Sequence, residues 1–318
     1  MGGTNTNQVS TATRKDLLKG IALWEADHAP SEGDMLVGGN KVTDTQSFIK
    51  IAHFTRPVGP SPVDERELLP EGRYDKVRTA EYSTQAYGLL VSFSKEAIRD
   101  NQYASVLIQT WGTDLRDLCH DVRDQALVNE FFNLAGTNTG PDGVAYISAS
   151  HPLDAEAAEL TEDNTALASN SLTGTVSVEL LNDAVDALKR QYDNKGRIMR
   201  ALPPLHVECD SKREVLWNQI KSPNMGYEPF NTDRNNGGMY SGMIASVIGL
   251  TRSTHDDYTI FRTANSRKMH RFVWDRQEVE VSELEYRMKD RSYEGSVDFR
   301  LAKGQFDWRG IVGALEGS

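Results

Sequence analysis

The longest regular pattern in the chain is an apolar stripe between Ser94 and Ala135. Its large apolar residues recur at spacings of three and four, the period of an α-helix: Leu107, Trp111, Leu115, Leu118, Val122 and Ala126. Ser94 is suited to cap the start of this helix and Gly136 to end it. The pattern predicts one long spine helix over 94–135. A helix with one apolar and one charged face is typical of a structural support rather than of a catalytic pocket.

Two strands are predicted before this helix, on either side of a proline-rich segment. Residues 48–54 are apolar enough for a strand, and the odd-numbered residues of 87–93 are large and apolar, as in a half-buried strand. The intervening RPVGPSPVDERELLPEG has four prolines, which disfavour regular structure. Long irregular segments in compact proteins are often functional. The predicted order is strand, extended loop, strand and spine helix.

The rest of the chain predicts short helices and many strands. Two further helices are predicted, one from near Ser177 to the turn at 194–196 and one capped by Asp210. Their apolar positions are Val178, Leu181, Val185, Leu188 and Tyr192 in the first, and Val215, Leu216 and Ile220 in the second. Strands are expected at 144–148, 205–209, 243–250, 258–261, 269–274, 277–285 and 296–301, and loops at 29–40, 154–171 and 222–241. This mixture predicts an α+β protein.

Composition narrows the class of protein. The 318 residues are enough for about two domains. The net charge of -11 argues against a protein whose whole surface grips nucleic acid. Two cysteines exclude a disulfide framework and fit a reducing compartment. The N-terminus lacks the apolar core of a signal peptide, and no apolar run is long enough to span a membrane.

Few residues have the spacing that catalysis or metal binding requires. The sequence contains no GxSxG, GxxxxGK or GxGxxG motif. His206 and Cys209 are close in sequence, but on a strand they point to opposite faces, so they are a poor zinc pair. Paired acidic residues are more typical of solvated faces: Asp183 with Asp186, and Glu278 with Glu280. The sequence predicts no catalytic residues, no cofactor-binding residues and no metal ligands.

Two tryptophans and one cysteine have a simple structural interpretation, whereas one basic segment has two possible interpretations. Trp111 and Trp217 occupy apolar helical positions and are expected in the core, and Cys119 is expected to be a buried thiol. The basic run RTANSRKMHR, residues 262–271, is the one segment suited to meet nucleic acid or an acidic neighbour. A solvated strand edge is the alternative interpretation, and the one we favour.

Three segments, in this order, resemble those of a known family. They are YGLLVSFSKEAIRDN, where a strand enters the spine helix; residues 150–210, where a His-Pro-Leu loop precedes a helix, a D-x-x-G turn, prolines and a strand; and FDWRG near the C-terminus. In element order over most of its length the chain resembles the major capsid proteins of tailed bacteriophages, which have the Hong Kong 97-type fold.

The resemblance implies an α+β fold with a long spine helix, an extended β-hairpin loop, and peripheral and axial domains. Transferred to this sequence, its parts are an N-terminal arm at 1–47, the extended loop at 48–92, a peripheral domain at 93–172 and 253–300 with the spine helix at 94–135, and an axial domain at 173–252 and 301–318.

The resemblance also implies partners. Copies of the chain would form hexamers and pentamers through the extended loop, the N-terminal arm and the spine helix, and these would build an icosahedral head. That head would enclose double-stranded DNA without sequence-specific binding, meet a portal protein, and involve no membrane. It would assemble in the cytoplasm of the bacterial host and become part of the virion.

Two departures from the family qualify this picture. The arm is too short for the cleaved scaffolding segment of some relatives, so any scaffolding protein, like any decoration protein, is expected to be a separate chain. Some relatives crosslink their subunits through a lysine of the extended loop. Lys76 lies in this loop, but nothing around it identifies a reactive pair, and no crosslink is predicted.

Two other functions remain open from the sequence. An encapsulin-like compartment that encloses cargo enzymes would share the same fold and lack the phage role. A small α+β hydrolase or binding protein would need a convergent set of polar residues, which the sequence does not offer.

Deletion of Pro57–Glu71 is expected to leave a folded subunit that does not assemble, because it removes the tip of the loop that would reach a neighbour. Circular dichroism would report folding and electron microscopy would report particles. Normal shells from this variant would contradict the role assigned to the loop.

Overall fold

A computed structural model describes residues 31–38, 48–54, 76–96, 104–154, 167–199, 204–221, 242–264, 271–282 and 285–315. The chain forms two compact units, which are described separately below. Unit 1 comprises Met1–Ser47, Ser83–Leu127 and Val273–Lys303, and unit 2 comprises Phe48–Tyr82, Val128–Phe272 and Gly304–Ser318. Most of the predicted N-terminal arm, the tip of the extended loop (55–75) and the predicted loop 222–241 lie outside the described residues.

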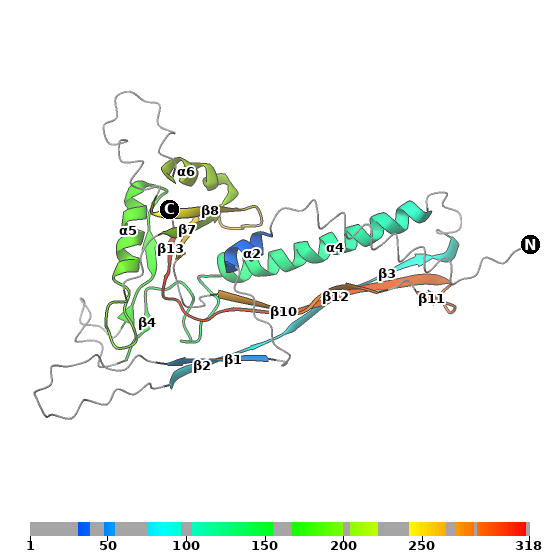
Figure 1. Cartoon of the computed structure of the whole chain (residues 1–318), viewed down its shortest axis with the longest axis horizontal. Coiled ribbons are helices and arrows are strands. Elements are labelled where there is room, and N and C mark those ends of the chain that lie inside the picture. Colours follow the sequence, from blue (N-terminus) through cyan, green and yellow to red (C-terminus); the bar gives the residue numbers. More distant parts are fainter. Residues whose placement is uncertain are drawn as a thin grey trace, which may run out of the picture. The chain divides into compact units, whose positions relative to one another are not determined.

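Unit 1 is a helix packed on a four-stranded sheet (Figure 1). The long strand β12 (Ser292–Gln305) pairs with β3 (Gln85–Ser94) in antiparallel register, and the order β10-β12-β11 adds β10 (Arg271–Val281) and β11 (Glu285–Arg287). Alternate residues of β12 point to the helix α4 (Ala104–Val128), where they meet Leu115 and Cys119: Val297, Phe299 and Leu301. The strand predicted at 296–301 is therefore confirmed, with its apolar face buried.

The predicted apolar stripe of the spine helix only partly coincides with the buried face. Leu115 is buried, as is Cys119, but Leu118 and Val122 are 51% and 45% exposed. The buried line instead follows steps of four residues and includes the charged side chain of Arg123. The apolar sector of α4 is wider than its contact with the sheet, so one flank of the stripe remains open. The side chains of Leu107 and Trp111 lie outside the described part of the chain.

The start of the predicted helix agrees with the structure as far as it is described. Ser94 is the last residue of β3, and Lys95 and Glu96 directly after it are helical; residues 97–103 are not described, and α4 is assigned from Ala104. At the other end α4 continues into a π-helical turn, η1 (Asn129–Asn133), in which the Leu134 amide donates to the Asn129 carbonyl at 2.9 Å. This wider turn ends the helical run just before Gly136.

A short helix lies where the sequence predicted a loop at 29–40. Helix α2 (Glu32–Val37) is capped by the Ser31 hydroxyl and ends at Gly38, which has a left-handed backbone. Leu36 and Val37 are fully buried in unit 1. The Arg123 guanidinium of α4 bonds the carboxylates of Asp34 at 2.9 Å and Asp275 at 2.8 Å.

These contacts explain why α2 forms despite its six residues. Burial disfavours the charge on Arg123, but the bonds to Asp275 and Asp34 outweigh this and raise its pKa. Tertiary contacts supply the stability that so short a helix lacks on its own.

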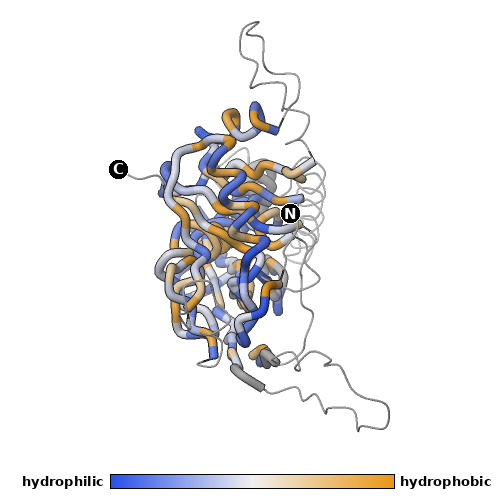
Figure 2. The backbone as a smooth tube through the Cα atoms, turned by 90° about the vertical axis from the view of Figure 1, so that its left-hand side faces the viewer, coloured by the Kyte–Doolittle hydropathy of each residue, from blue (hydrophilic) through white to orange (hydrophobic). Residues whose placement is uncertain are grey.

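Unit 2 is built on a five-stranded mixed sheet with the order β6-β13-β9-β7-β8 (Figure 1). Its strands are β6 (Ser171–Thr173), β7 (Leu205–Asp210), β8 (Ile244–Leu250), β9 (Tyr258–Thr263) and β13 (Ile311–Leu315). Helices α5 (Val178–Lys189) and α6 (Ser211–Lys221) bury Leu181, Leu188 and Trp217 in its core. In Figure 2 apolar and polar stretches alternate along the described backbone, as expected for elements with one buried face.

Two two-stranded sheets complete the described part of unit 2. The strands β4 (His151–Pro152) and β5 (Leu167–Ala168) form one, and β1 (Phe48–Phe54) and β2 (Lys76–Ser83) form the other. The strand predicted at 48–54 is confirmed to the residue. Among the described residues no helix is both long and apolar enough to cross a membrane.

Three sequence predictions for smaller elements are corrected. On α6 the predicted apolar residues Val215 and Leu216 are 62% and 47% exposed, and Trp217 faces the sheet instead. Residues 144–148 form only an isolated bridge, between Thr139 and Ala145. The strands expected at 269–274 and 277–285 are mostly one strand, β10, which lies beside β12 in the sheet.

Trp217→Ala is expected to lower the free energy of unfolding by about 3–5 kcal/mol, because it empties a core site where the indole meets Phe261 edge-on. Urea unfolding measures the change. The neighbouring Leu216→Ala is the matched control and should have little effect, since Leu216 is exposed. Equal effects of the two substitutions would contradict the assigned face of α6.

Candidate functional site

Unit 1 exposes four large apolar side chains on the strand β3 and the spine helix α4. Leu89 and Leu90 on β3 are 47% and 60% exposed, and Leu118 and Val122 lie on the open flank of α4. We call these four residues the exposed apolar set. Soluble proteins expose single apolar residues routinely, but neighbouring ones on the same element often mark an interaction surface.

The strand β3 has the features of an edge that another chain covers. Within the described residues it pairs with β12 alone. Its ten residues, QAYGLLVSFS, include no charge and no proline. Natural sheet edges are usually protected by charged residues, proline or short length, because an open ladder pairs with other chains. A long uncharged edge is therefore suited to association.

A buried carboxylate joins two arginines in the sheet of unit 2. Glu208 on β7 accepts hydrogen bonds from Arg262 Nε at 2.9 Å and from Arg271 Nη1 at 2.7 Å and 2.8 Å. The second guanidinium also donates to the carbonyl of Phe131 in η1 at 3.1 Å. Burial lowers the pKa of Arg271, and the charge of Glu208 opposes this shift. The three side chains form a paired, largely dry ion cluster.

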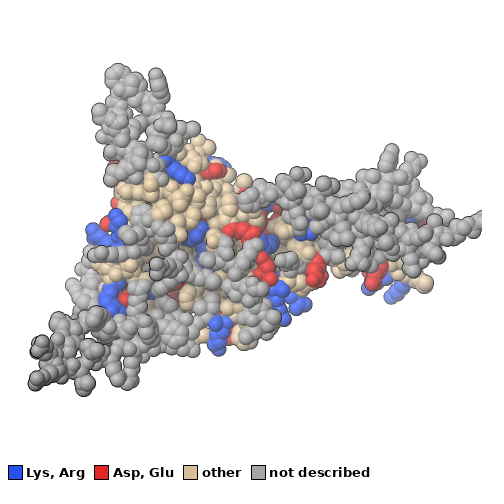
Figure 3. All heavy atoms as spheres, in the orientation of Figure 1, with Lys and Arg blue, Asp and Glu red and all other residues tan. Residues whose placement is uncertain are grey.

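This cluster corrects both interpretations of the basic run 262–271 for the two arginines at its ends only. The residues at its two ends, Arg262 and Arg271, are 7% and 1% exposed, so neither is available to nucleic acid or to solvent. Because β9 lies inside the sheet, Arg262 is not on a strand edge. Residues 265–270 lie outside the described part of the chain. On the face shown in Figure 3, the visible basic and acidic side chains are interspersed.

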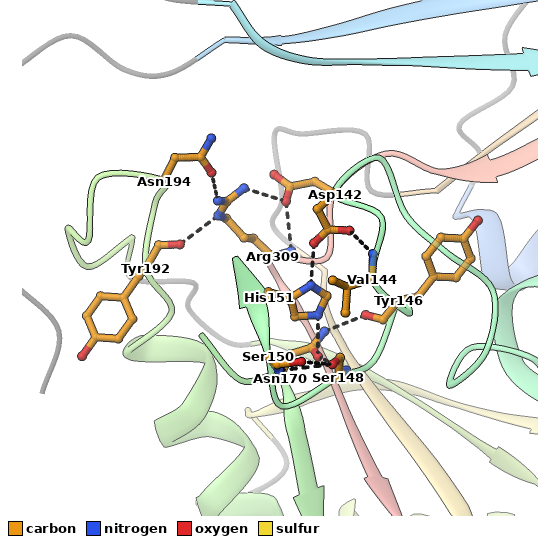
Figure 4. Close-up of polar contacts among 11 residues, drawn as sticks. Asp142, Val144, Tyr146, Ser148, Ser150, His151, Asn170, Tyr192, Asn194 and Arg309 are labelled. Carbon is orange, nitrogen blue, oxygen red and sulfur yellow. Dashed lines mark hydrogen bonds and ion pairs between the residues drawn. The ribbon is translucent and has the colours of Figure 1, made fainter. Parts of the chain in front are cut away.

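A second buried polar cluster surrounds His151 (Figure 4). The ring is fully buried, with Nδ1 at 2.6 Å from Asp142 Oδ2 and Nε2 at 3.0 Å from Asn170 Oδ1. The ring stacks on the indole of Trp308 at 4.3 Å between centroids. We call Asp142, His151 and Asn170 the His151 network. It connects the turn after the spine helix with the β4–β5 segment.

Arg309 continues the polar cluster on the side of the C-terminal strands. Its guanidinium bonds Asp307 at 3.0 Å, the Tyr192 carbonyl at 2.8 Å and the side chain of Asn194, and it lies over the Trp308 ring. Arg309 and Trp308 belong to the FDWRG segment, which sequence analysis singled out only by resemblance. The side chains of Asp307 and Arg309 are buried, and the bonds of Arg309 run to groups of the same unit.

The structure separates the residues of the weak metal candidate. His206 bonds Ser246 Oγ at 2.6 Å, and burial, together with the charge of Arg262, lowers its pKa. Cys209 is fully buried, and burial raises the pKa of its thiol to about 12. Within the described residues no three potential ligands converge on one point.

The other singled-out residues lie as expected or outside the described part. Cys119 and Trp217 are buried, and Asp183 and Asp186 are exposed on α5. The side chain of Glu278 is not described. Sequence analysis assigned no role to His151, because its partners are 9 and 19 residues away and no motif connects them.

Comparison with protein-family models and with curated protein sequences finds no match. Solved structures do match along nearly the whole chain. The subunit of the capsid of an empty GTA particle superposes with a TM-score of 0.55 at 11% identity, covering 92% of each chain. The capsid of Myoviridae phage XM1 gives 0.52 at 11% identity, covering 91% of this chain and 94% of that chain.

A virus-like particle from Pyrococcus furiosus gives a TM-score of 0.50 at 10% identity and covers 96% of this chain and 98% of that chain. At these identities the likeness establishes the fold. The predicted Hong Kong 97-type capsid fold, with its spine helix and α+β composition, is confirmed.

Glu208→Gln is expected to lower the free energy of unfolding by about 3–5 kcal/mol, because it removes the charge that two buried guanidinium groups share. Urea unfolding measures the loss. The control is Asp256→Asn, which breaks the exposed pair with Lys212 and should leave the midpoint unchanged. A Glu208 variant as stable as the parent would show that the cluster does not hold the sheet.

Proposed function

We propose that the chain is the major capsid protein of a tailed phage or prophage and acts as a structural subunit without enzymatic activity. The observation that carries this proposal is the match of more than 90% of the chain to subunits of closed particles. A fold by itself does not establish a function, so the surface of the subunit must also suit the proposed function.

The exposed apolar set supports assembly with copies of the same chain. Leu89 and Leu90 lie on an uncharged strand edge, and Leu118 lies on the open flank of the spine helix. A second copy is the occupant that the fold favours, because its solved counterparts form particles from repeated subunits. In the shell, a second copy would cover this surface and remove its apolar area from water. In the isolated subunit the same area would stay exposed to water.

The finer roles follow from the resemblance and remain part of the proposal. Hexamers and pentamers would form through the extended loop (48–92), the N-terminal arm (1–47) and the spine helix. The peripheral domain (93–172 and 253–300) and the axial domain (173–252 and 301–318) would take the places that they have in the family. The head would enclose double-stranded DNA, meet a portal and any separate scaffolding or decoration protein, and assemble in the host cytoplasm. A net charge of -11 suits a container that must release its DNA.

An encapsulin-like compartment is the second candidate, and the match to the Pyrococcus furiosus virus-like particle is compatible with it. The two functions differ in content rather than in fold. Terminase and portal genes beside the coding sequence would support the phage role, and a cargo-enzyme gene would support the compartment.

Electron microscopy of the purified recombinant chain tests the proposal directly. Uniform closed polyhedral particles are expected, alone or on co-expression with a candidate scaffolding protein. Small isolated particles under both conditions would favour a binding protein and contradict the shell role.

Leu90→Lys is expected to leave the subunit folded and to reduce the yield of shells at least tenfold. Leu90 is 60% exposed on the edge strand, so a lysine loses little packing within the subunit but places a charge where a second copy would pair. Circular dichroism and particle counts from sedimentation measure the two effects. Leu90→Met keeps the apolar surface and should assemble normally. Equal shell yields from both variants would exclude β3 from the interface.

A further inference from the structure

The His151 network presents the imidazole with two hydrogen-bond acceptors and no donor (Figure 4). On one side, Asp142 is a carboxylate that already accepts the Val144 amide at 3.3 Å. On the other, the orientation of the Asn170 amide is fixed by two further bonds. Its Nδ2 donates to the Tyr146 carbonyl at 2.8 Å, and its Oδ1 accepts from the Ser148 amide at 2.8 Å. The oxygen of Asn170 therefore faces His151.

A neutral imidazole cannot satisfy this arrangement. It has one protonated and one bare ring nitrogen, so in either tautomer a bare nitrogen would face an oxygen lone pair. That unmade bond would be fully buried, because the His151 side chain has no exposed surface. Both bonds form when one additional proton is present, on the ring or shared with Asp142 over their 2.6 Å separation.

We propose that the His151 network binds this additional proton in the folded protein and is a pH-sensitive lock within unit 2. The charged form pairs with the Asp142 carboxylate and donates to Asn170, and the loss of the proton breaks the bond to Asn170. The lock is a property of this unit and does not depend on the proposed shell function.

The surroundings of the ring fit a charged imidazole. Asp142 is the carboxylate in direct contact, and its side chain is 3% exposed, so a proton on the ring places a positive charge beside a buried negative one. Among the described residues, Arg309 lies over the same Trp308 ring, and Asp307 bonds Arg309 at 3.0 Å. The opposite charges of Arg309 and Asp307 neutralise each other. The stacked indole adds the negative face that cations prefer.

The network connects segments that are distant in sequence. Asn170 also receives the Gly313 amide of β13 on its backbone carbonyl at 2.9 Å, and its own amide donates to the Ser148 carbonyl at 3.0 Å. A break at His151 would therefore loosen the turn at 138–150 from the β5–β6 segment. Because the folded state holds one proton more than the unfolded chain at neutral pH, the stability that the network contributes decreases as the pH rises.

The test compares the full parent chain with Asp142→Asn in urea unfolding between pH 6 and pH 9. The introduced amide can still accept the Val144 amide and can donate to Nδ1, so a neutral imidazole completes every bond in this variant. The stability advantage of the parent over Asp142→Asn is expected to decrease with rising pH. His255→Gln, at an exposed histidine, is the control and should leave the pH dependence of the parent unchanged. A difference between parent and Asp142→Asn that does not change with pH would overturn the proposal.

A second measurement needs no variant and covers the case in which Asp142→Asn does not fold. Nitrogen NMR of the parent chain with labelled histidine distinguishes protonated from bare ring nitrogens. At pH 8, where exposed imidazoles are neutral, one of the seven histidines is expected to retain protons on both nitrogens. If every histidine shows one bare nitrogen at this pH, the lock does not exist.

Discussion

The carboxylate of Glu208, held between two guanidinium groups, is the interaction on which unit 2 depends. It lies in the middle of the sheet on β7, bonds Arg262 on the neighbouring β9, and bonds Arg271 at the start of β10. Arg271 in turn holds the Phe131 carbonyl in the π-helical turn. Three charges buried together are tolerated only because each has partners, so the sheet of unit 2 and the π-helical turn stabilise each other.

Unit 1 follows a different constraint, the incomplete coverage of a sheet by one helix. Buried residues of β12 meet Leu115 and Cys119, and Arg123 fastens the short helix α2 to the same surface. Among the described residues, the outer edge of β3 pairs with no second strand, and one flank of α4 is exposed. Under the proposed function, a second copy of the chain would cover these surfaces.

Sequence periodicity correctly predicted the buried side of a helix and a strand that each bury only one face. The alternation at Val297, Phe299 and Leu301 and the stripe of α5 both gave the correct buried side. The apolar periods and their order were also sufficient for the fold class, which the comparison with solved capsids confirmed. These features depend on neighbours within a few residues, and the chain itself contains that information.

Only the tertiary structure decided the rest. Leu118 and Val122 belong to an apolar stripe but remain exposed, because the width of the packing partner sets the buried sector. Arg262 and Arg271 had the pattern of a basic surface and are buried, because Glu208, more than 50 residues away, neutralises them. His151 had no recognisable role until folding brought Asp142 and Asn170 to its two nitrogens. Periodicity reports whether a residue prefers water, whereas the pairing of a buried charge depends on residues that only the fold brings together.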